Sequence, residues 1–143
     1  MNIYAESSAI VSWLLGEDSG NRVRQILRRS KFIATSELTI LECGRVLIRA
    51  LSIGEIDEGT ADDRRAALNA AAEHWHVLRI SSEIIERAGH PFPAEPIRTL
   101  DAIHLASALT ARGAISRLEL LSLDSRIRES GQQLGFRVRP KAW

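Results

Sequence analysis

Hydrophobic and polar positions along this chain switch repeatedly between two spacings. Short runs rich in β-branched and aromatic residues predict strands, and apolar residues three and four positions apart predict helices. The expected strands cover residues 2–5, 32–35, 76–80, 118–123 and 136–139. The expected helices cover residues 7–15, 19–30, 37–50, 57–75, a short stretch after 81 or 82, 100–112 and 125–134. Strands and helices therefore alternate along most of the chain.

Residues that begin and end helices support these boundaries. Ser36 and Thr99 precede expected helices and are good N-caps, while Gly16 and Gly135 stand where helices should end. Residues 89–96 contain three prolines, which predict a loop too short to separate two domains. A chain of 143 residues with 45% hydrophobic content suits one domain with a sizeable core. We therefore expect a single domain over residues 1–143.

The alternation predicts an α/β sandwich with a mainly parallel sheet, because parallel strands need crossover connections. In such sheets, ligands bind at the carboxyl ends of the strands. Glu6 directly follows the first expected strand, Asp124 follows the strand at 118–123, and Asp101 lies in the first turn of the helix after the proline loop. We expect these three acids to converge on one rim of the sheet.

A fourth acid, Glu42, lies in a largely apolar helix and should be partly buried. Carboxylates gathered in one place repel one another and take up protons unless a cation holds them ionised. Oxygen ligands without cysteine or a histidine pair favour Mg²⁺ or Mn²⁺ over zinc. Such ions suit hydrolysis of a phosphodiester, so Glu6, Glu42, Asp101 and Asp124 are the candidate metal ligands and catalytic residues.

Each of these acids also has an ordinary structural explanation. Glu6 and Asp124 suit helix N-termini, and Asp101 suits the first turn after a Thr99 cap. Glu42 could pair with Arg45 or Arg49 along its own helix. Taken singly, the structural explanation is the stronger one for each acid. The four acids together are what favour a functional site.

Charge and composition narrow the choice of function. The chain has 19 basic and 18 acidic residues, so any nucleic-acid site must be local. The single cysteine, Cys43, excludes an intramolecular disulfide and fits a reducing compartment. The apolar residues 9–15 are too few to span a bilayer and lack a basic leader, so we expect a cytoplasmic protein with no membrane partner. The sequence also lacks a Gly-rich phosphate loop and the common serine-hydrolase and zinc-protease motifs.

Four segments in order along the chain resemble the PIN-domain family, and specifically the VapC-type toxins of bacterial toxin–antitoxin operons. They are IYAESSAIVSWLL, SELTILECGRVLIRA, RTLDAIHLASAL and LLSLDSRIRESGQQLGFRV. The resemblance implies a three-layer α/β/α fold and an Mg²⁺- or Mn²⁺-dependent endoribonuclease. It also implies a homodimer and neutralisation by a VapB-like antitoxin. By the same resemblance, Ser8 would bind the first acid or a metal-bound water.

Glu6 departs from the resembling family, whose first acid is ordinarily aspartate. Glutamate keeps the charge but extends the carboxylate by roughly 1.5 Å. Misplacement by about 1 Å can cost on the order of 100-fold in rate. The alternative is therefore a weakly active or inactive PIN-fold module that binds RNA or regulates an operon.

Other residues near the acids are weaker candidates. His104 follows Asp101 by one helical turn and could serve the site, although a packing role is favoured. Arg45, Arg49 and Arg98 are the basic residues nearest the acids in sequence, so they are candidates for binding RNA phosphates. The basic C-terminal residues that end at Trp143 could contact RNA or an antitoxin, although a solvated terminus is expected.

Overall fold

The computed structural model describes residues 1–142, and Trp143, the aromatic end of the basic C-terminus, lies outside them. Its centre is a sheet of parallel strands in the order β3-β2-β1-β4-β5. The strands are β1 (Asn2–Ala5), β2 (Phe32–Ser36), β3 (His76–Leu78), β4 (Leu118–Leu121) and β5 (Val138–Arg139). The prediction of a parallel α/β sheet is confirmed.

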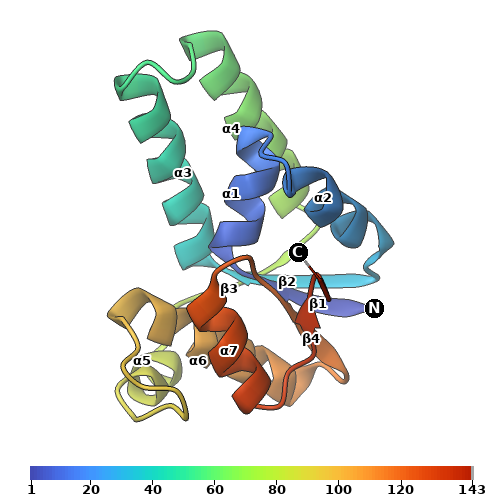
Figure 1. Ribbon diagram of the computed structural model, residues 1–143, viewed down its shortest axis with the longest axis vertical. Helices are drawn as coiled ribbons and strands as arrows, with labels where there is room; N and C mark the ends of the chain where they lie inside the picture. The colour runs from blue at the N-terminus through green and yellow to red at the C-terminus, as the bar shows by residue number, and fades with distance from the viewer. Residues whose placement is uncertain (143) are drawn as a thin grey trace.

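Seven helices are assigned within residues 1–142. Four come before β3 in the chain, namely α1 (Ser7–Leu15), α2 (Gly20–Arg29), α3 (Glu37–Ser52) and α4 (Glu58–Ala72). Three come later, namely α5 (Ser82–Ala88), α6 (Thr99–Ala114) and α7 (Ser125–Gln133). Figure 1 shows the first four helices on one side of the sheet and the last three on the other, which gives the expected three layers.

The two faces of the sheet bury two separate apolar clusters, because successive side chains of a strand point to opposite faces. In β1, Ile3 and Ala5 pack in the cluster under α1 to α4, whereas Tyr4 packs in the cluster under α5 to α7. All three residues are fully buried. Burial of an Ile side chain contributes about 1.5–3 kcal/mol, so the central strand anchors both layers.

Tight turns bring the chain from the sheet into the helices that flank the acids. The Glu6 amide donates to the Leu121 carbonyl at 2.9 Å, which fixes the end of β1 against the end of β4. Ser36 caps α3 by accepting from the Leu38 amide at 3.1 Å, as its position in the sequence predicts. The carboxyl ends of β1, β2 and β4 therefore open onto one rim.

Several boundaries differ from the predicted ones. β4 ends at Leu121, so Asp124 lies beyond a short connection and not directly after the strand. Thr99 is the first residue of α6 and not its cap, because the N-cap position belongs to Arg98, which makes no side-chain capping bond. The helix α3 is also less buried than its largely apolar sequence indicates, since Leu41 is 61% and Ile48 is 41% exposed.

The helix that was expected over 57–75 ends at Ala72, and the strand that was expected over 76–80 ends at Leu78. The strand that was expected over 136–139 is shorter and covers only β5 (Val138–Arg139). Within the described residues, none of the helices has both the length and the apolar character needed to cross a membrane. The C-terminus is not freely solvated throughout, because the Arg139 guanidinium pairs with Glu119 on the neighbouring strand.

Candidate active site at the carboxyl rim of the sheet

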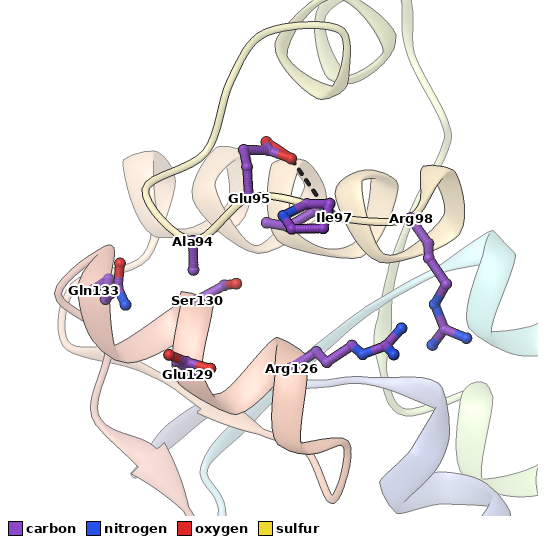
Figure 2. Close-up of a pocket in the computed structure, with 9 residues that line it drawn as sticks. Ala94, Glu95, Ile97, Arg98, Arg126, Glu129, Ser130 and Gln133 are labelled. Carbon is purple, nitrogen blue, oxygen red and sulfur yellow. Dashed lines mark hydrogen bonds between the residues drawn. The ribbon is translucent and has the colours of Figure 1, made fainter.

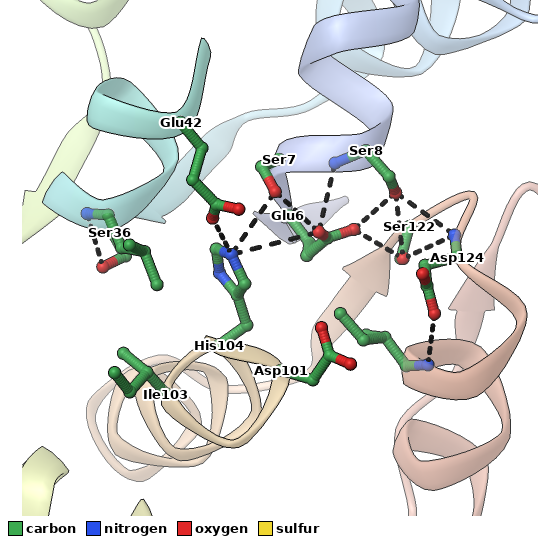
Figure 3. A network of polar contacts seen from close by, with 12 residues as sticks. Glu6, Ser7, Ser8, Ser36, Glu42, Asp101, Ile103, His104, Ser122 and Asp124 are labelled. Carbon is green, nitrogen blue, oxygen red and sulfur yellow. Dashed lines mark hydrogen bonds and ion pairs between the residues drawn. The ribbon is translucent and has the colours of Figure 1, made fainter. Parts of the chain in front are cut away.

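Glu6 is the N-cap of α1, and its carboxylate folds back over the start of that helix (Figure 3). One oxygen, Oε1, accepts from the Ser7 hydroxyl at 2.8 Å and the Ser8 amide at 3.1 Å. The other, Oε2, accepts from the hydroxyls of Ser8 at 2.5 Å and Ser122 at 2.7 Å. Four donors match the acceptor capacity of a carboxylate. Glu6 is only 3% exposed, so this network holds it in one place.

The Ser8 hydroxyl joins two connections that follow neighbouring strands. It donates to Glu6 and accepts from the amides of Leu123 at 2.9 Å and Asp124 at 3.2 Å. Asp124 is itself the N-cap of α7, where its carboxylate accepts from the amides of Arg126 and Ile127. The ordinary capping explanation therefore applies to both Glu6 and Asp124, and the same geometry places them near each other.

His104 lies between Glu6 and Glu42 and links them (Figure 3). Its Nε2 atom is 2.5 Å from an oxygen of Glu42 and 4.0 Å from an oxygen of Glu6. Its Nδ1 atom is 3.4 Å from the Tyr4 hydroxyl. At 2% exposure the imidazole is deeply buried among polar groups. The expected packing role for His104 is thus incomplete, because the residue also orients an acid.

Glu42 comes to the rim from α3 and is 28% exposed at its side chain, as its predicted partial burial requires. Its partner is His104, and neither Arg45 nor Arg49 forms an ion pair with it among residues 1–142. Both arginines are exposed on α3. The structure therefore does not bring these two candidate RNA-binding residues into the polar network.

Asp101 and Asp124 share a cationic partner, Arg98, in the connection that precedes α6. The Arg98 Nε atom is 3.0 Å from Asp101, and its Nη2 atom is 3.8 Å from Asp124. The hydrogen bond and charge of Asp101 raise the pKa of Arg98 above its usual value. A positive charge already bridges these two carboxylates. The Arg98 side chain is 64% exposed, so it can leave without opening the core.

Negative charge at the rim also affects neighbouring groups. Burial raises the pKa of the Cys43 thiol to about 12, and the charges of Glu42 and Glu6 add to the effect. Burial likewise raises the pKa of Tyr4 well above its usual range, and the same two acids contribute. In both groups burial is the larger cause, and the two acids add to it.

The predicted acids form two adjoining groups in this arrangement. Glu6 and Glu42 meet through His104, while Asp101 and Asp124 meet through Arg98. Over the described residues 1–142, no three His, Cys, Asp or Glu side chains stand close enough to hold one ion. The donor chemistry still fits a hard cation, because every acid supplies carboxylate oxygen and Arg98 already supplies positive charge there. Such an ion requires Arg98 to move aside.

Sequence reasoning missed Ser122 and underrated His104. Ser122 lies two residues before Asp124 in the sequence, and its hydroxyl donates a hydrogen bond to the buried Glu6 carboxylate. Its position at a strand end beside a candidate acid could have indicated this. The position of His104 one turn after Asp101 was noted, but its contact with Glu42 depends on how α3 and α6 pack.

Comparison with known proteins identifies the family. Residues 3–132 match the family model of the PIN domain. The chain is 34% identical over 136 residues to Ribonuclease VapC46 of Mycobacterium tuberculosis, which covers 95% of each protein. It resembles the structure of VapC20 from Mycobacterium tuberculosis, a sarcin–ricin loop cleaving toxin, with a TM-score of 0.65 and 15% identity over 94% of this chain and 96% of that one.

A toxin–antitoxin complex from Klebsiella pneumoniae gives a TM-score of 0.61 at 20% identity, over 87% of this chain and 88% of that one. At these low identities the two structures establish the shared fold. The family model and the curated relative establish more, and they confirm the resemblance drawn from the four sequence segments. The chain therefore belongs to the PIN-domain family and, within it, to the VapC ribonucleases.

Proposed function

We propose that this protein is a metal-dependent endoribonuclease that acts as the toxin of a toxin–antitoxin pair. The observation that carries the proposal is the placement of four acids, from four separate parts of the chain, along one rim of the sheet. The relationship to a named ribonuclease supplies the reaction class. The substrate is RNA, and the bond that breaks is a phosphodiester.

Mg²⁺ or Mn²⁺ is the cofactor that suits these donors. Asp101 and Asp124 would hold it together with Glu42 and Glu6, once the Arg98 guanidinium has left its place between the two aspartates. When bound, such an ion activates water and neutralises the charge that builds on the leaving oxygen. The support is electrostatic, because Asp101 and Asp124 already share the positive charge of Arg98, and a metal ion would supply that charge once Arg98 has left.

The remaining polar residues position the acids. Ser8 and Ser122 hold the Glu6 carboxylate, and His104 holds Glu42. Buried hydrogen bonds of this kind fix catalytic groups, and misplacement by about 1 Å can lower a rate on the order of 100-fold. Once displaced, Arg98 would be free to bind an RNA phosphate. Arg45 and Arg49, which lie on α3, are weaker candidates for the same role.

Two protein partners follow from the same proposal, a VapB-like antitoxin and a second copy of this chain. The structural similarity to a toxin–antitoxin complex supports the first partner. Apolar side chains that face outward on and after α3, Leu41, Ile48, Leu51 and Ile53, support a protein interface.

The alternative, an inactive RNA-binding or regulatory module, rests on glutamate in place of aspartate at position 6. The similarity to a ribonuclease over nearly the full chain favours activity instead. Comparison of the natural protein with Glu6→Asp separates the two. If only the Glu6→Asp protein cleaves RNA, the alternative holds.

Cleavage of a structured RNA by purified protein tests the proposed function. The natural protein should cut in Mg²⁺ or Mn²⁺, stop in chelator, and recover when the ion is restored. Asp101→Asn should lose at least about 100-fold in rate, because it removes a charged group that the reaction needs. Asp62→Asn, an exposed acid on α4, is the matched control and should cut like the natural protein. Equal cleavage by Asp101→Asn would refute the proposal.

A further inference from the structure

A pocket of about 450 Å³ lies beside the acid rim, between the proline loop and α7 (Figure 2). The loop side includes Ile97 and Arg98. The α7 side includes Arg126, Glu129, Ser130 and Gln133. These four residues share one face of the helix because they are spaced three, four and seven positions apart. The pocket begins at Arg98, the residue that bridges Asp101 and Asp124.

The pocket adjoins the acid site directly. A smaller crevice lined by Asp101 and Leu105 shares Ile97, Arg126 and Ser130 with it. That crevice has no room for a water molecule, so the pocket reaches Asp101 through Arg98, whose Nε atom is 3.0 Å from this acid. Ligand contacts in the pocket and chemistry at the rim can involve the same molecule.

The charges in the pocket are divided between its two ends. Figure 2 shows the guanidinium groups of Arg98 and Arg126 together at one end, and Arg98 is the residue that contacts Asp101 and Asp124. Glu129 and Gln133 lie toward the other end. Within residues 1–142, Arg126 and Glu129 form no side-chain ion pair. Paired arginines are suited to phosphate, and free amide and carboxylate groups are suited to the edge of a base.

Ser130 offers a hydroxyl to a ligand in the pocket. The residue is 1% exposed, yet its hydroxyl makes no hydrogen bond with any residue from 1 to 142. By contrast, Ser107 on α6 donates to the Ile103 carbonyl one turn earlier at 2.7 Å. The Ser130 hydroxyl points into the pocket (Figure 2). The hydroxyl oxygen itself is open to the pocket, because Thr39 Oγ1 is the one buried side-chain atom within residues 1–142 that lacks a hydrogen-bond partner. A polar ligand can bond to the Ser130 hydroxyl in place of water.

We propose that this pocket binds one guanosine nucleotide of the RNA substrate, next to the bond that is cut. Arg98 and Arg126 bind its phosphate, and Ser130, Glu129 and Gln133 bind its base. Arg126 and Gln133 are separated by about 10 Å along the helix, which suits the reach of one nucleotide. Guanine is the base with two adjacent N–H donors on its Watson–Crick edge, and a carboxylate accepts both. This inference rests on the ribonuclease function proposed above.

Equilibrium binding of nucleoside monophosphates to the full-length protein in chelator tests the pocket without any cleavage. Calorimetric titration should show 5′-GMP binding about tenfold more tightly than 5′-UMP, the scale expected for a two-bond base contact. Glu129→Gln should remove most of that preference and leave 5′-UMP binding unchanged. Gln133→Ala should weaken 5′-GMP, whereas Gln132→Ala, its exposed neighbour, should not.

Equal affinity for the two nucleotides, or full 5′-GMP preference in Glu129→Gln, would overturn the inference. Both altered side chains are exposed, so circular dichroism should show intact folding. The assay contains no divalent ion and no RNA cleavage. Its failure therefore refutes the pocket and leaves the proposed function standing. Failure of the Asp101→Asn cleavage test refutes the proposed function, whereas nucleotide binding in the pocket would still be measured separately.

Discussion

Glu6 has two structural tasks at the scale of single residues. It caps α1, and it accepts four hydrogen bonds that join the ends of β1 and β4. A ligand for a cation must keep one lone pair available, so metal binding at Glu6 requires one hydroxyl to turn away.

Replacement of Glu6 by glutamine tests its structural task. The amide nitrogen cannot accept, so at least one buried donor is left without a partner, at a cost of about 1–3 kcal/mol. Urea unfolding should therefore show lower stability for Glu6→Gln. Glu86→Gln, an exposed change on α5, should unfold like the natural protein. Equal stability of the two variants would mean that the Glu6 network contributes little.

The sequence predicted which acids reach the rim but not how they are paired. A strand-end position sufficed for Glu6, because parallel strands end at a common edge. Asp101 was expected there from its place in the first turn of a helix, which the structure confirms. The pairing of His104 with Glu42, and of Arg98 with both aspartates, depends on side-chain conformations and on helix packing. Spacing within one helix cannot predict either contact.

At the scale of elements, close packing of α1 against α2 supports the rim from behind. Gly20, in the first turn of α2, lies directly against the backbone of α1. A Cβ atom at this position would stand 2.5 Å from the Ser12 carbonyl oxygen. The Ser12 hydroxyl also bonds Ser19 at 2.7 Å, which explains why Ser19 does not cap α2.

Gly20→Ala should destabilise the protein by about 1–3 kcal/mol, because the clash involves backbone that cannot easily move. The matched control is Gly44→Ala in the middle of α3, where the nearest heavy atom to a new Cβ would be 4.0 Å away. That change should stabilise the helix by about 0.5–1 kcal/mol. Denaturant midpoints measure both. A Gly20→Ala protein as stable as the Gly44→Ala protein would contradict the packing account.

Alternation of strands and helices predicted the order of elements well, and the errors are confined to their ends. β4 is shorter than its apolar run, because Ser122 and Leu123 form the connection that carries Asp124. β3 likewise ends early, at Leu78. Apolar character alone does not distinguish a paired strand from a buried connection. Hydrogen-bond partners in the neighbouring strand decide that boundary.

At the scale of the whole molecule, the three layers bring distant parts of the chain to one edge. Glu6 and Glu42 come from the α1–α4 side, and Asp101 from the α5–α7 side. The sheet between them fixes their spacing. The account predicts that these acids act as one cation site, although in the described arrangement they divide between His104 and Arg98.

Titration of the RNA-free protein with Mn²⁺, followed by electron paramagnetic resonance of the free ion, tests this claim most directly. The natural protein should bind Mn²⁺ saturably. Asp101→Asn should bind at least about tenfold more weakly, a loss of about 1.4 kcal/mol, while Asp62→Asn binds normally. Absence of binding by the natural protein, or equal binding by Asp101→Asn, would contradict the account.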